Sequence, residues 1–202
     1  WADLITVTIL HLLGHRWPKQ IEASEPLPDW ADPDGIIPLT PLANESPLLD
    51  RVQARLNANE IDASDFAQVM GKPLDAWLAT EFFKHHTKQF KKRPIAWQLQ
   101  SGKFTARKTL AFTCLVYYHK LDGDLLPKIR TQYVGPLRQR LETELRGIES
   151  TAVGARSDRQ EKRRAELEDQ IEELCQFDAA LAKVVTEGFA SKQLTEIATK
   201  EP

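Results

Sequence analysis

Cysteine is scarce in this chain of 202 residues, which contains only Cys114 and Cys175. Two cysteines are too few for the disulfide framework of a small secreted domain, and they stand too far apart in the sequence for a zinc knuckle. This usage is typical of proteins in a reducing compartment. We therefore expect a cytoplasmic location.

Long hydrophobic runs are missing as well. The longest apolar stretch, LITVTILHLLG at residues 4–14, is too short to span a bilayer. It also lacks the basic leader and the small-residue cleavage site of a signal peptide. Hydrophobic residues make up 42% of the chain and charged residues 28%, which is ordinary for a soluble protein. We expect no membrane partner.

Methionine occurs once, at Met70, and the chain begins at Trp1 in the middle of an apolar pattern. We therefore expect this chain to be a piece of a longer protein. Its length suits one domain of good size or two small ones, with enough residues to bury a core. The function is then expected to belong to a parent protein whose catalytic parts lie elsewhere.

The motifs of common active sites are also absent. None of the nine glycines forms a GxGxxG or GxxxxGK loop, and there is no GxSxG elbow. His11 and His15 stand four residues apart, but Gly14 lies between them and no Glu follows His11, so ordinary packing is favoured over zinc binding. The adjacent His85 and His86 would point about 100° apart on a helix. We predict no catalytic, cofactor-binding or metal-binding residue in this chain.

The first half of the chain alternates helix signals with a proline-rich segment. Residues 3–13 are predicted to form a buried helix that stops at Gly14, with a buried strand as the weaker alternative. Seven prolines between Pro18 and Pro47 argue against regular structure there. We expect that segment to attach to the core through Trp30, Ile36, Ile37 and Leu39.

Three more helices are predicted before Pro94. The first opens with Ser46 as N-cap and Pro47, and the second covers residues 64–70 and ends at Gly71. The third carries one apolar face and, on another side, Lys84, Lys88, Lys91 and Lys92. The predicted buried faces of the first and third helices consist of Leu48, Leu49, Val52 and Leu56, and of Leu74, Trp77, Leu78, Phe82 and His85.

After Pro94, the segments PIAWQLQS and LAFTCLVYYHK have the alternation and the β-branched and aromatic content of strands. We predict a β-hairpin or small sheet over about residues 94–120, with a basic loop around Gly102. Beyond Pro136, apolar steps of three and four predict two long antiparallel helices, with Asp178 as an interruption. The seams are Leu137, Leu141, Leu145 and Ile148, and Leu167, Ile171, Leu174, Leu181 and Val185.

The predicted fold class is therefore α+β: mainly α-helical, with one hairpin or small sheet and a C-terminal pair of long helices resembling a coiled coil. We expect a mixed module at residues 1–135, with the hairpin and a basic face. The helical pair then occupies residues 136–202. Most carboxylates lie in the proline-rich segment and on the C-terminal helices, where solvated faces are the expected environment.

The basic charge is concentrated in one stretch. Between Phe82 and Leu121 there are nine lysines and arginines and no carboxylate, although the formal net charge of the chain is only −2. Such a surface attracts phosphate and releases counterions. Pairing with the acidic C-terminal helices and simple solubility are the alternatives. We predict one DNA-binding patch made of Lys84, Lys88, Lys91, Lys92, Arg93, Lys103, Arg107 and Lys108.

Several ordered phrases resemble a known family. The run EFFKHHTKQFKKRPIAWQLQSG, then FTCLVYYHKL, LLPKIRTQYVGPL and IEELCQFDAAL, is similar to the C-terminal part of large adenine-specific DNA methyltransferases. These are the BREX phage-defence methylase PglX and its type IIG restriction-methylation relatives. In that family KRPIYW introduces a hairpin, a strand like LVYYHR follows, and R-x-x-Y precedes the long helices. The upstream stretches LLGHRW and DPDGIIPLT resemble the family's FGRW and DGIIPL.

The matching residues of this chain are Arg93, Pro94, Ile95 and Trp97 in the first phrase, Tyr117, Tyr118 and His119 in the second, and Arg130 and Tyr133 in the third. Ala96 stands where the family has an aromatic residue, and His15 intrudes into the upstream GRW phrase. The resemblance covers nearly the whole chain. It is more specific to the superfamily than to one defence system.

The resemblance implies that catalysis lies outside this chain. Such enzymes methylate a flipped adenine through an Asn-Pro-Pro-Tyr-type motif, yet none of Asn44, Asn57 and Asn59 precedes a proline. S-adenosylmethionine is expected in the missing N-terminal part. The implied partners are double-stranded DNA contacted at phosphates, the rest of the methyltransferase, and other defence proteins. The alternative is a structural or protein-interaction module without nucleic-acid contact.

Overall fold

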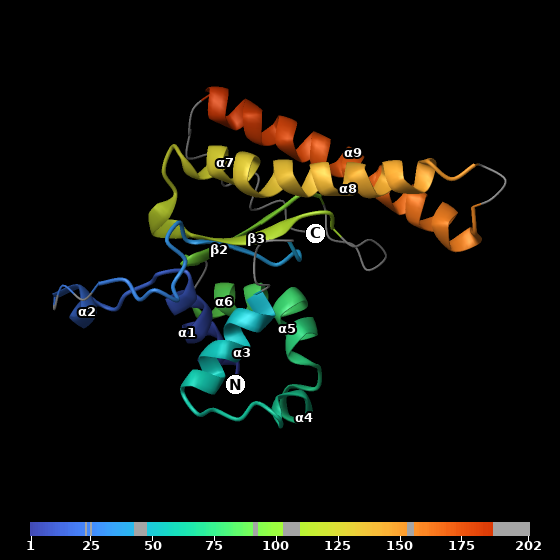
Figure 1. Ribbon diagram of the computed structural model, residues 1–202. Coiled ribbons are helices and arrows are strands. Elements are labelled where there is room, and N and C mark those ends of the chain that lie inside the picture. The colour runs from blue at the N-terminus through green and yellow to red at the C-terminus, as the bar shows by residue number, and fades with distance from the viewer. Residues whose placement is uncertain are drawn as a thin grey trace. The chain divides into compact units, whose positions relative to one another are not determined.

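The computed structural model describes residues 1–22, 24, 26–42, 48–90, 93–102, 110–152 and 156–187 (Figure 1). The chain divides into two compact units. Unit 1 consists of Trp1–Leu99 and Cys114–Leu121, and unit 2 consists of Gln100–Thr113 and Asp122–Pro202. Each unit is described separately below. The expected division after residue 135 stays a prediction.

The helices of unit 1 begin with α1 (Ala2–Leu12), so the helical interpretation of the first apolar block is confirmed over the strand. The chain leaves α1 through Gly14, whose φ of 87° is a conformation that glycine adopts without strain. Gly71 ends a short helix in the same way, with φ 73°. The remaining helices are α2 (Pro18–Glu22), α3 (Leu48–Ala58), α4 (Phe66–Met70), α5 (Leu74–Thr80) and α6 (Phe82–Gln89).

The single helix predicted ahead of Pro94 is in fact two helices. The backbone breaks at Glu81, which has φ −117° and ψ −28° between α5 and α6. The break changes the phase of the apolar face, so that α6 buries Phe82 and His86, four residues apart. His85 was predicted on this face and is only partly buried. The predicted cap formed by Ser46 and Pro47 lies outside the described residues.

The proline-rich segment has more regular structure than its composition predicts. Pro18 opens α2, where a missing N–H costs nothing, and Ile36–Pro38 form strand β1. Pro38 is tolerated because β1 is an edge strand. Ile36 and Ile37 are buried as predicted. Trp30 is not a core residue: 36% of its surface is exposed, and the Arg55 guanidinium lies 4.1 Å from its ring centroid.

The predicted hairpin is confirmed and belongs to a three-stranded sheet of order β1-β3-β2. Strand β2 is Ala96–Gln100 and strand β3 is Thr113–Tyr117, and β1 pairs antiparallel with β3 in the register Ile37↔Leu115. All five residues of β3 are buried. The predicted second strand ends early, because Tyr118–Lys120 form a 3₁₀ turn instead.

The core of unit 1 lies between one face of this sheet and the helices α1, α3, α5 and α6 (Figure 1). Ile37 and Leu115 contribute the sheet side, and Ile5 and Ile9 contribute the α1 side. Trp77 at the centre meets two phenylalanine rings edge to face. Such aromatic pairs add about 0.5–1.5 kcal/mol beyond the area they bury.

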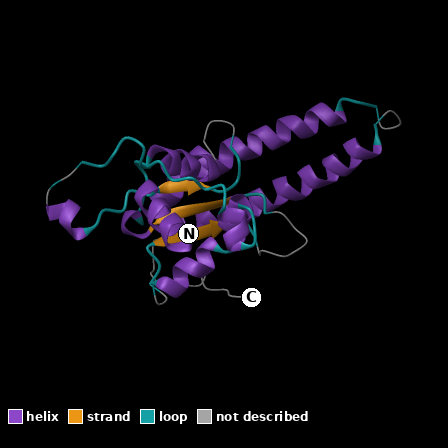
Figure 2. Cartoon of the chain, turned by 90° about the horizontal axis from the view of Figure 1, so that it is seen from below, coloured by secondary structure: helices purple, strands orange, loops and turns teal. Residues whose placement is uncertain are grey.

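Unit 2 contains α7 (Leu125–Lys128), a π-helical segment (Ile129–Val134), α8 (Gly135–Glu149) and α9 (Asp158–Glu187). Figures 1 and 2 show α8 and α9 side by side, as predicted for an antiparallel pair. Leu137, Leu141, Leu167, Leu174 and Leu181 are buried, as the seams predict.

Two details of this helical pair differ from the prediction. Phe177 and Val184 are buried, whereas Ile171 and Val185 are only partly buried. The buried positions 174, 177, 181 and 184 follow one another in steps of three and four, so the seam passes through Phe177 and Val184. Asp178 does not interrupt the helix, which runs unbroken from residue 158 to residue 187. Its carboxylate instead pairs with Arg130 on the preceding segment.

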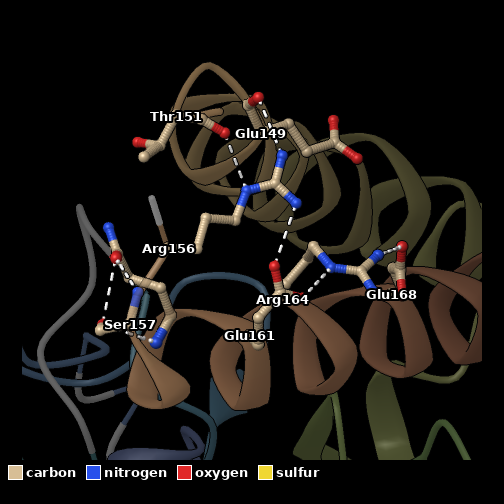
Figure 3. A network of polar contacts seen from close by, with 8 residues as sticks. Glu149, Thr151, Arg156, Ser157, Glu161, Arg164 and Glu168 are labelled. Atoms are coloured by element: carbon tan, nitrogen blue, oxygen red, sulfur yellow. Dashed lines mark hydrogen bonds and ion pairs between the residues drawn. The ribbon is translucent and has the colours of Figure 1, made fainter. Parts of the chain in front are cut away.

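The turn between α8 and α9 is closed by Arg156 (Figure 3). Its Nε donates to the Thr151 carbonyl at 2.9 Å and its Nη2 to the Glu149 carbonyl at 3.0 Å, so it caps the end of α8. Its Nη1 lies 3.2 Å from Glu161 of α9. One guanidinium therefore ties the two helices together at the turn.

None of the helices in the described ranges combines the length and the apolar character needed to cross a bilayer.

Candidate nucleic-acid interface

The structure describes three of the eight predicted DNA-binding residues. Lys84 and Lys88 lie on α6, and Arg93 follows it, with all three exposed. The other five, Lys91, Lys92, Lys103, Arg107 and Lys108, lie outside the described residues. That the eight form one patch therefore stays a prediction.

Lys84 and Lys88 border a shallow hollow of about 610 Å³ on the surface of unit 1. Its rim also includes Lys72, from the turn before α5, and His85. The Lys84 side chain is 75% exposed. Helix α6 therefore presents two lysines to solvent beside a concave surface, and Lys72 adds a third cation from a different element.

Glu81 is a carboxylate in the middle of these cations. It lies at the break between α5 and α6, with its Oε1 2.9 Å from Lys72 Nζ and 3.9 Å from Lys84 Nζ. The hydrogen bond from Lys72 lowers the pKa of Glu81, and the nearby Lys72 and Lys84 charges act in the same direction. At neutral pH Glu81 is ionised and offsets part of the positive charge around the hollow.

The family-like phrase around Pro94 is held by His86. The Nε2 atom of this fully buried histidine accepts the backbone N–H groups of Ile95 and Ala96, both at 3.0 Å. An acceptor at Nε2 requires the neutral ring with its proton on Nδ1. Trp97 Nε1 donates to the Pro94 carbonyl at 3.0 Å, which fixes the indole on the same turn.

The other phrases meet at the same sheet. The Tyr117 N–H donates to the Gly35 carbonyl at 2.8 Å, and Lys120 Nζ donates to the Pro33 carbonyl, so the YYHK and DPDGIIP stretches lie together. Gly35 has φ 68°, and a Cβ there would lie 2.9 Å from the Tyr117 Cβ. The turn therefore requires glycine both for its backbone conformation and for this close approach.

The two N-terminal histidines are engaged in local contacts. His11 Nε2 accepts a hydrogen bond from Trp17 Nε1 at 2.9 Å, and His15 Nδ1 lies 3.1 Å from the Tyr117 hydroxyl. Burial lowers the pKa of both rings, with a further contribution from Arg55 at His11 and from His119 at His15. Across the described ranges, no three His, Cys, Asp or Glu side chains are grouped so that they could hold a metal ion.

The R-x-x-Y phrase also has a structural role. Arg130 Nε and Nη2 donate to the two Asp178 carboxylate oxygens at 2.8 and 3.2 Å, a bidentate pair. This contact lowers the pKa of Asp178. Tyr133 is buried. The phrase thus fixes the π-helical segment against α9.

Sequence reasoning missed several residues. Lys72 and Glu81 flank the predicted basic stretch, and only the fold brings Lys72 to the same hollow. His86 was considered only as a metal ligand beside His85, and His85 was placed on the buried face instead, although the spacing of His86 from Phe82 is a helical signal. Asp32 and Glu173 were assigned with the other carboxylates to solvated faces, but 4% and 7% of their surfaces are exposed. The donors to Glu173, which are Ser101 and Ala111, lie far away in the sequence, and no local pattern reveals them. Asp32 accepts the N–H groups of Asp34 and Ile36 in its own turn and pairs with Arg51 of α3.

These contacts define an α+β module whose characteristic phrases build the framework, and in the described part of the basic stretch Lys84, Lys88 and Arg93 are exposed. The chain is 36% identical over 108 residues to the adenine-specific methyltransferase BrxX of Escherichia coli O9:H4 (strain HS), which is 52% of this chain and 8% of that protein. It is 30% identical over 114 residues to the adenine-specific methyltransferase PglX of Lacticaseibacillus casei (strain Zhang), which is 54% of this chain and 9% of that protein.

The chain is thus a PglX-like relative of these adenine-specific methyltransferases, as the sequence phrases predict. The alignments span less than a tenth of the length of the two relatives. No protein-family profile matches the chain.

Proposed function

We propose that this chain is a non-catalytic C-terminal module of an adenine-specific DNA methyltransferase of a phage-defence or restriction-modification system. It contributes contacts to the DNA backbone and a scaffold for neighbouring parts of the enzyme. S-adenosylmethionine binds in another part of the parent protein, which acts in the cytoplasm. Other defence proteins are the remaining partners.

The observation that carries this proposal is the exposed pair Lys84 and Lys88 beside the hollow, in a stretch without carboxylates and in a relative of adenine-specific methyltransferases. Lysine ammonium groups bind phosphate as point charges on flexible stems, which suits sequence-independent contact. Such contacts position DNA while other regions of the enzyme read its bases. The curated names of the relatives support the methyltransferase context.

The charge pairs of unit 2 support DNA contact over internal neutralisation of the basic stretch. Glu144 pairs with Arg163 at 2.7 Å, and Asp178 pairs with Arg130 at 2.8 Å. Glu161 contacts both Arg156 and Arg164. Many carboxylates of the long helices thus already have arginine partners within their own unit, which supports an external anion as the partner of the exposed lysines of α6.

The second candidate function is a structural module without nucleic-acid contact. It is favoured by the observation that the family-like phrases around His86, Gly35 and Arg130 are occupied by internal contacts. The two functions differ in their dependence on salt. Phosphate contact makes the logarithm of DNA affinity fall linearly with the logarithm of salt concentration, whereas a scaffold shows no such relation.

The first prediction concerns the lysines of α6. Replacing Lys84, Lys88 and Lys91 together by Gln in the full-length protein should reduce the salt slope of DNA binding by about one unit per lost contact. All duplex sequences should be weakened about equally, because phosphates carry no sequence information. Affinity for a labelled duplex is measured by fluorescence anisotropy from about 50 to about 200 mM salt.

The matched control replaces Lys19, Lys162 and Lys183 by Gln, which removes the same charge from exposed positions on other helices. This control should keep the slope of the wild type. If the α6 variant keeps its fold and binds with unchanged affinity and slope, the lysines of α6 face protein or solvent instead of DNA.

The second prediction concerns Glu81, whose replacement should strengthen DNA binding instead of weakening it. Replacing Glu81 by Gln removes the negative charge that contacts Lys72 and Lys84. The affinity for duplex DNA should therefore rise and its salt dependence should steepen, in the same titration. Lower affinity in a folded Glu81→Gln protein would show that Glu81 supports this surface by orienting Lys72 rather than by opposing its charge.

A further inference from the structure

Two aromatic side chains form a stacked pair at the surface of unit 1. The rings of Trp97, in β2, and Tyr118, directly after β3, have centroids 6.2 Å apart and planes inclined by 20°. This is an offset stack, the arrangement that aromatic rings prefer over a direct sandwich. Trp97 is half-buried, whereas 50% of the Tyr118 surface is exposed. Contact with Trp97 therefore leaves much of the phenol ring open to solvent.

The turn at Pro94 and Ile95 holds both members of the pair. Trp97 Nε1 donates to the Pro94 carbonyl at 3.0 Å, and the Tyr118 N–H donates to the Ile95 carbonyl at 2.8 Å. The Ile95 N–H is itself bound by His86 Nε2, which fixes the turn to α6. The pair is thus formed without a ligand, and a contact surface that is organised in advance lowers the entropic cost of binding.

The surroundings of the pair favour an anionic ligand. Arg93 directly precedes the turn and His119 directly follows Tyr118, and both are exposed. The His119 ring meets the Tyr118 ring edge to face, with centroids 5.4 Å apart. Residues 82–121, which include the pair, contain no carboxylate. A ligand that combines flat rings with negative charge matches this combination better than an apolar protein surface does.

We infer that Trp97 and Tyr118 form a stacking platform for an unpaired base of DNA, as in a single strand, with Arg93 as the contact for the adjoining phosphate. This inference rests on the proposed function. Aromatic side chains stack on any base, because every base has a flat π-face. Inside a duplex those faces are covered by neighbouring bases, so only an unpaired base can extend the stack. Enzymes that modify a base of DNA act on single strands or extrude the base from the duplex.

The experiment compares Tyr118→Ala with the wild type in the full-length protein, using a labelled single strand of mixed sequence and the matching duplex over a salt series. Loss of one stacked base should weaken single-strand binding by about 5- to 150-fold. Affinity for the intact duplex should not change. The salt slopes of both should also stay the same, because the phenol carries no charge that replaces a counterion.

Four further variants separate stacking from charge and from general stability. Tyr118→Phe keeps the ring and should bind the single strand like the wild type. Tyr118→Leu keeps an apolar side chain without a ring, so it tests stacking if Tyr118→Ala does not fold. Arg93→Gln should reduce the single-strand salt slope by about 0.7, the value for one phosphate contact. Trp30→Ala removes a 36% exposed ring that lies against Arg55 and should change none of these quantities.

Each outcome supports or overturns the platform. Single-strand affinity that folded Tyr118→Ala or Tyr118→Leu retains would overturn the inference, and so would a wild type that does not bind the single strand. An equal loss on single strand and duplex also counts against it, because the ring then contacts something other than an unpaired base. The proposed function is judged separately, by the duplex salt slope of the α6 lysine variant, which these ring substitutions leave unchanged.

Discussion

Replacing His86 by Leu is expected to lower the free energy of unfolding of the chain by about 4 kcal/mol. The substitution removes the acceptor of two backbone N–H groups, those of Ile95 and Ala96, and each unsatisfied buried donor costs about 1–3 kcal/mol. The loss of ring packing between Phe82 and Phe90 adds to this. Urea denaturation followed by circular dichroism measures the change.

The same residue makes stability depend on pH. Burial, with the neighbouring His85 charge, lowers the pKa of His86 from 6.5 to about 4. Between these values the unfolded chain binds a proton that the folded chain excludes, so stability is complete above pH 6.5 and decreases as the pH falls toward 4. The loss approaches about 3 kcal/mol at pH 4.

The contribution of His86 is isolated by comparing the pH dependence of stability between the wild type and two variants. The pKa of His11 and of His15 is lowered as well, so the wild type alone reports several groups. His86→Asn should lack the component due to His86, whereas His85→Gln, at a partly exposed position, should retain it. Equal pH dependence in wild type and His86→Asn between pH 4 and 6.5 would show that His86 does not titrate in this way.

The second large effect is expected at Asp32. Only 4% of this residue is exposed; its Oδ1 accepts the N–H groups of Asp34 and Ile36 at 3.1 and 3.0 Å, and its Oδ2 pairs with Arg51 at 3.1 Å. Asp32→Ala leaves these donors without a partner inside the turn that leads into β1. The free energy of unfolding should fall by about 3 kcal/mol, the low end for a buried pair, because the Arg51 side chain is 21% exposed.

A double-mutant cycle with Arg51→Ala tests this interpretation. The two substitutions should be less than additive, because the second removes a group that the first has already left unpaired. Asp29→Ala, an exposed substitution in the same segment, should change stability by no more than about 0.5 kcal/mol. Additive losses at Asp32 and Arg51 would mean that the carboxylate acts only through the backbone of the turn.

The sequence by itself determined the features that depend on neighbouring residues. Helix ends at Gly14 and Gly71 follow from the left-handed conformation that glycine accepts, and the pairing of α8 with α9 follows from apolar spacing. The hairpin strands follow from alternation around a loop. The ordered phrases also identified the methyltransferase relatives correctly. In each case the signal lies within a few turns or strands of the residues it describes.

Only the tertiary structure decided which polar residues are buried and what they hold. His86 and Asp32 are buried against N–H groups of nearby turns, and Asp32 also pairs with Arg51 of α3. Ile36–Pro38 became a strand because β3 supplies partners from far along the chain, and Glu173 is buried because the distant Ser101 hydroxyl and Ala111 N–H replace its water. Lys72 reached the hollow beside Lys84 in the same way. A hydrogen bond across the fold leaves no periodic trace in the sequence, because either partner alone is also compatible with a solvated surface.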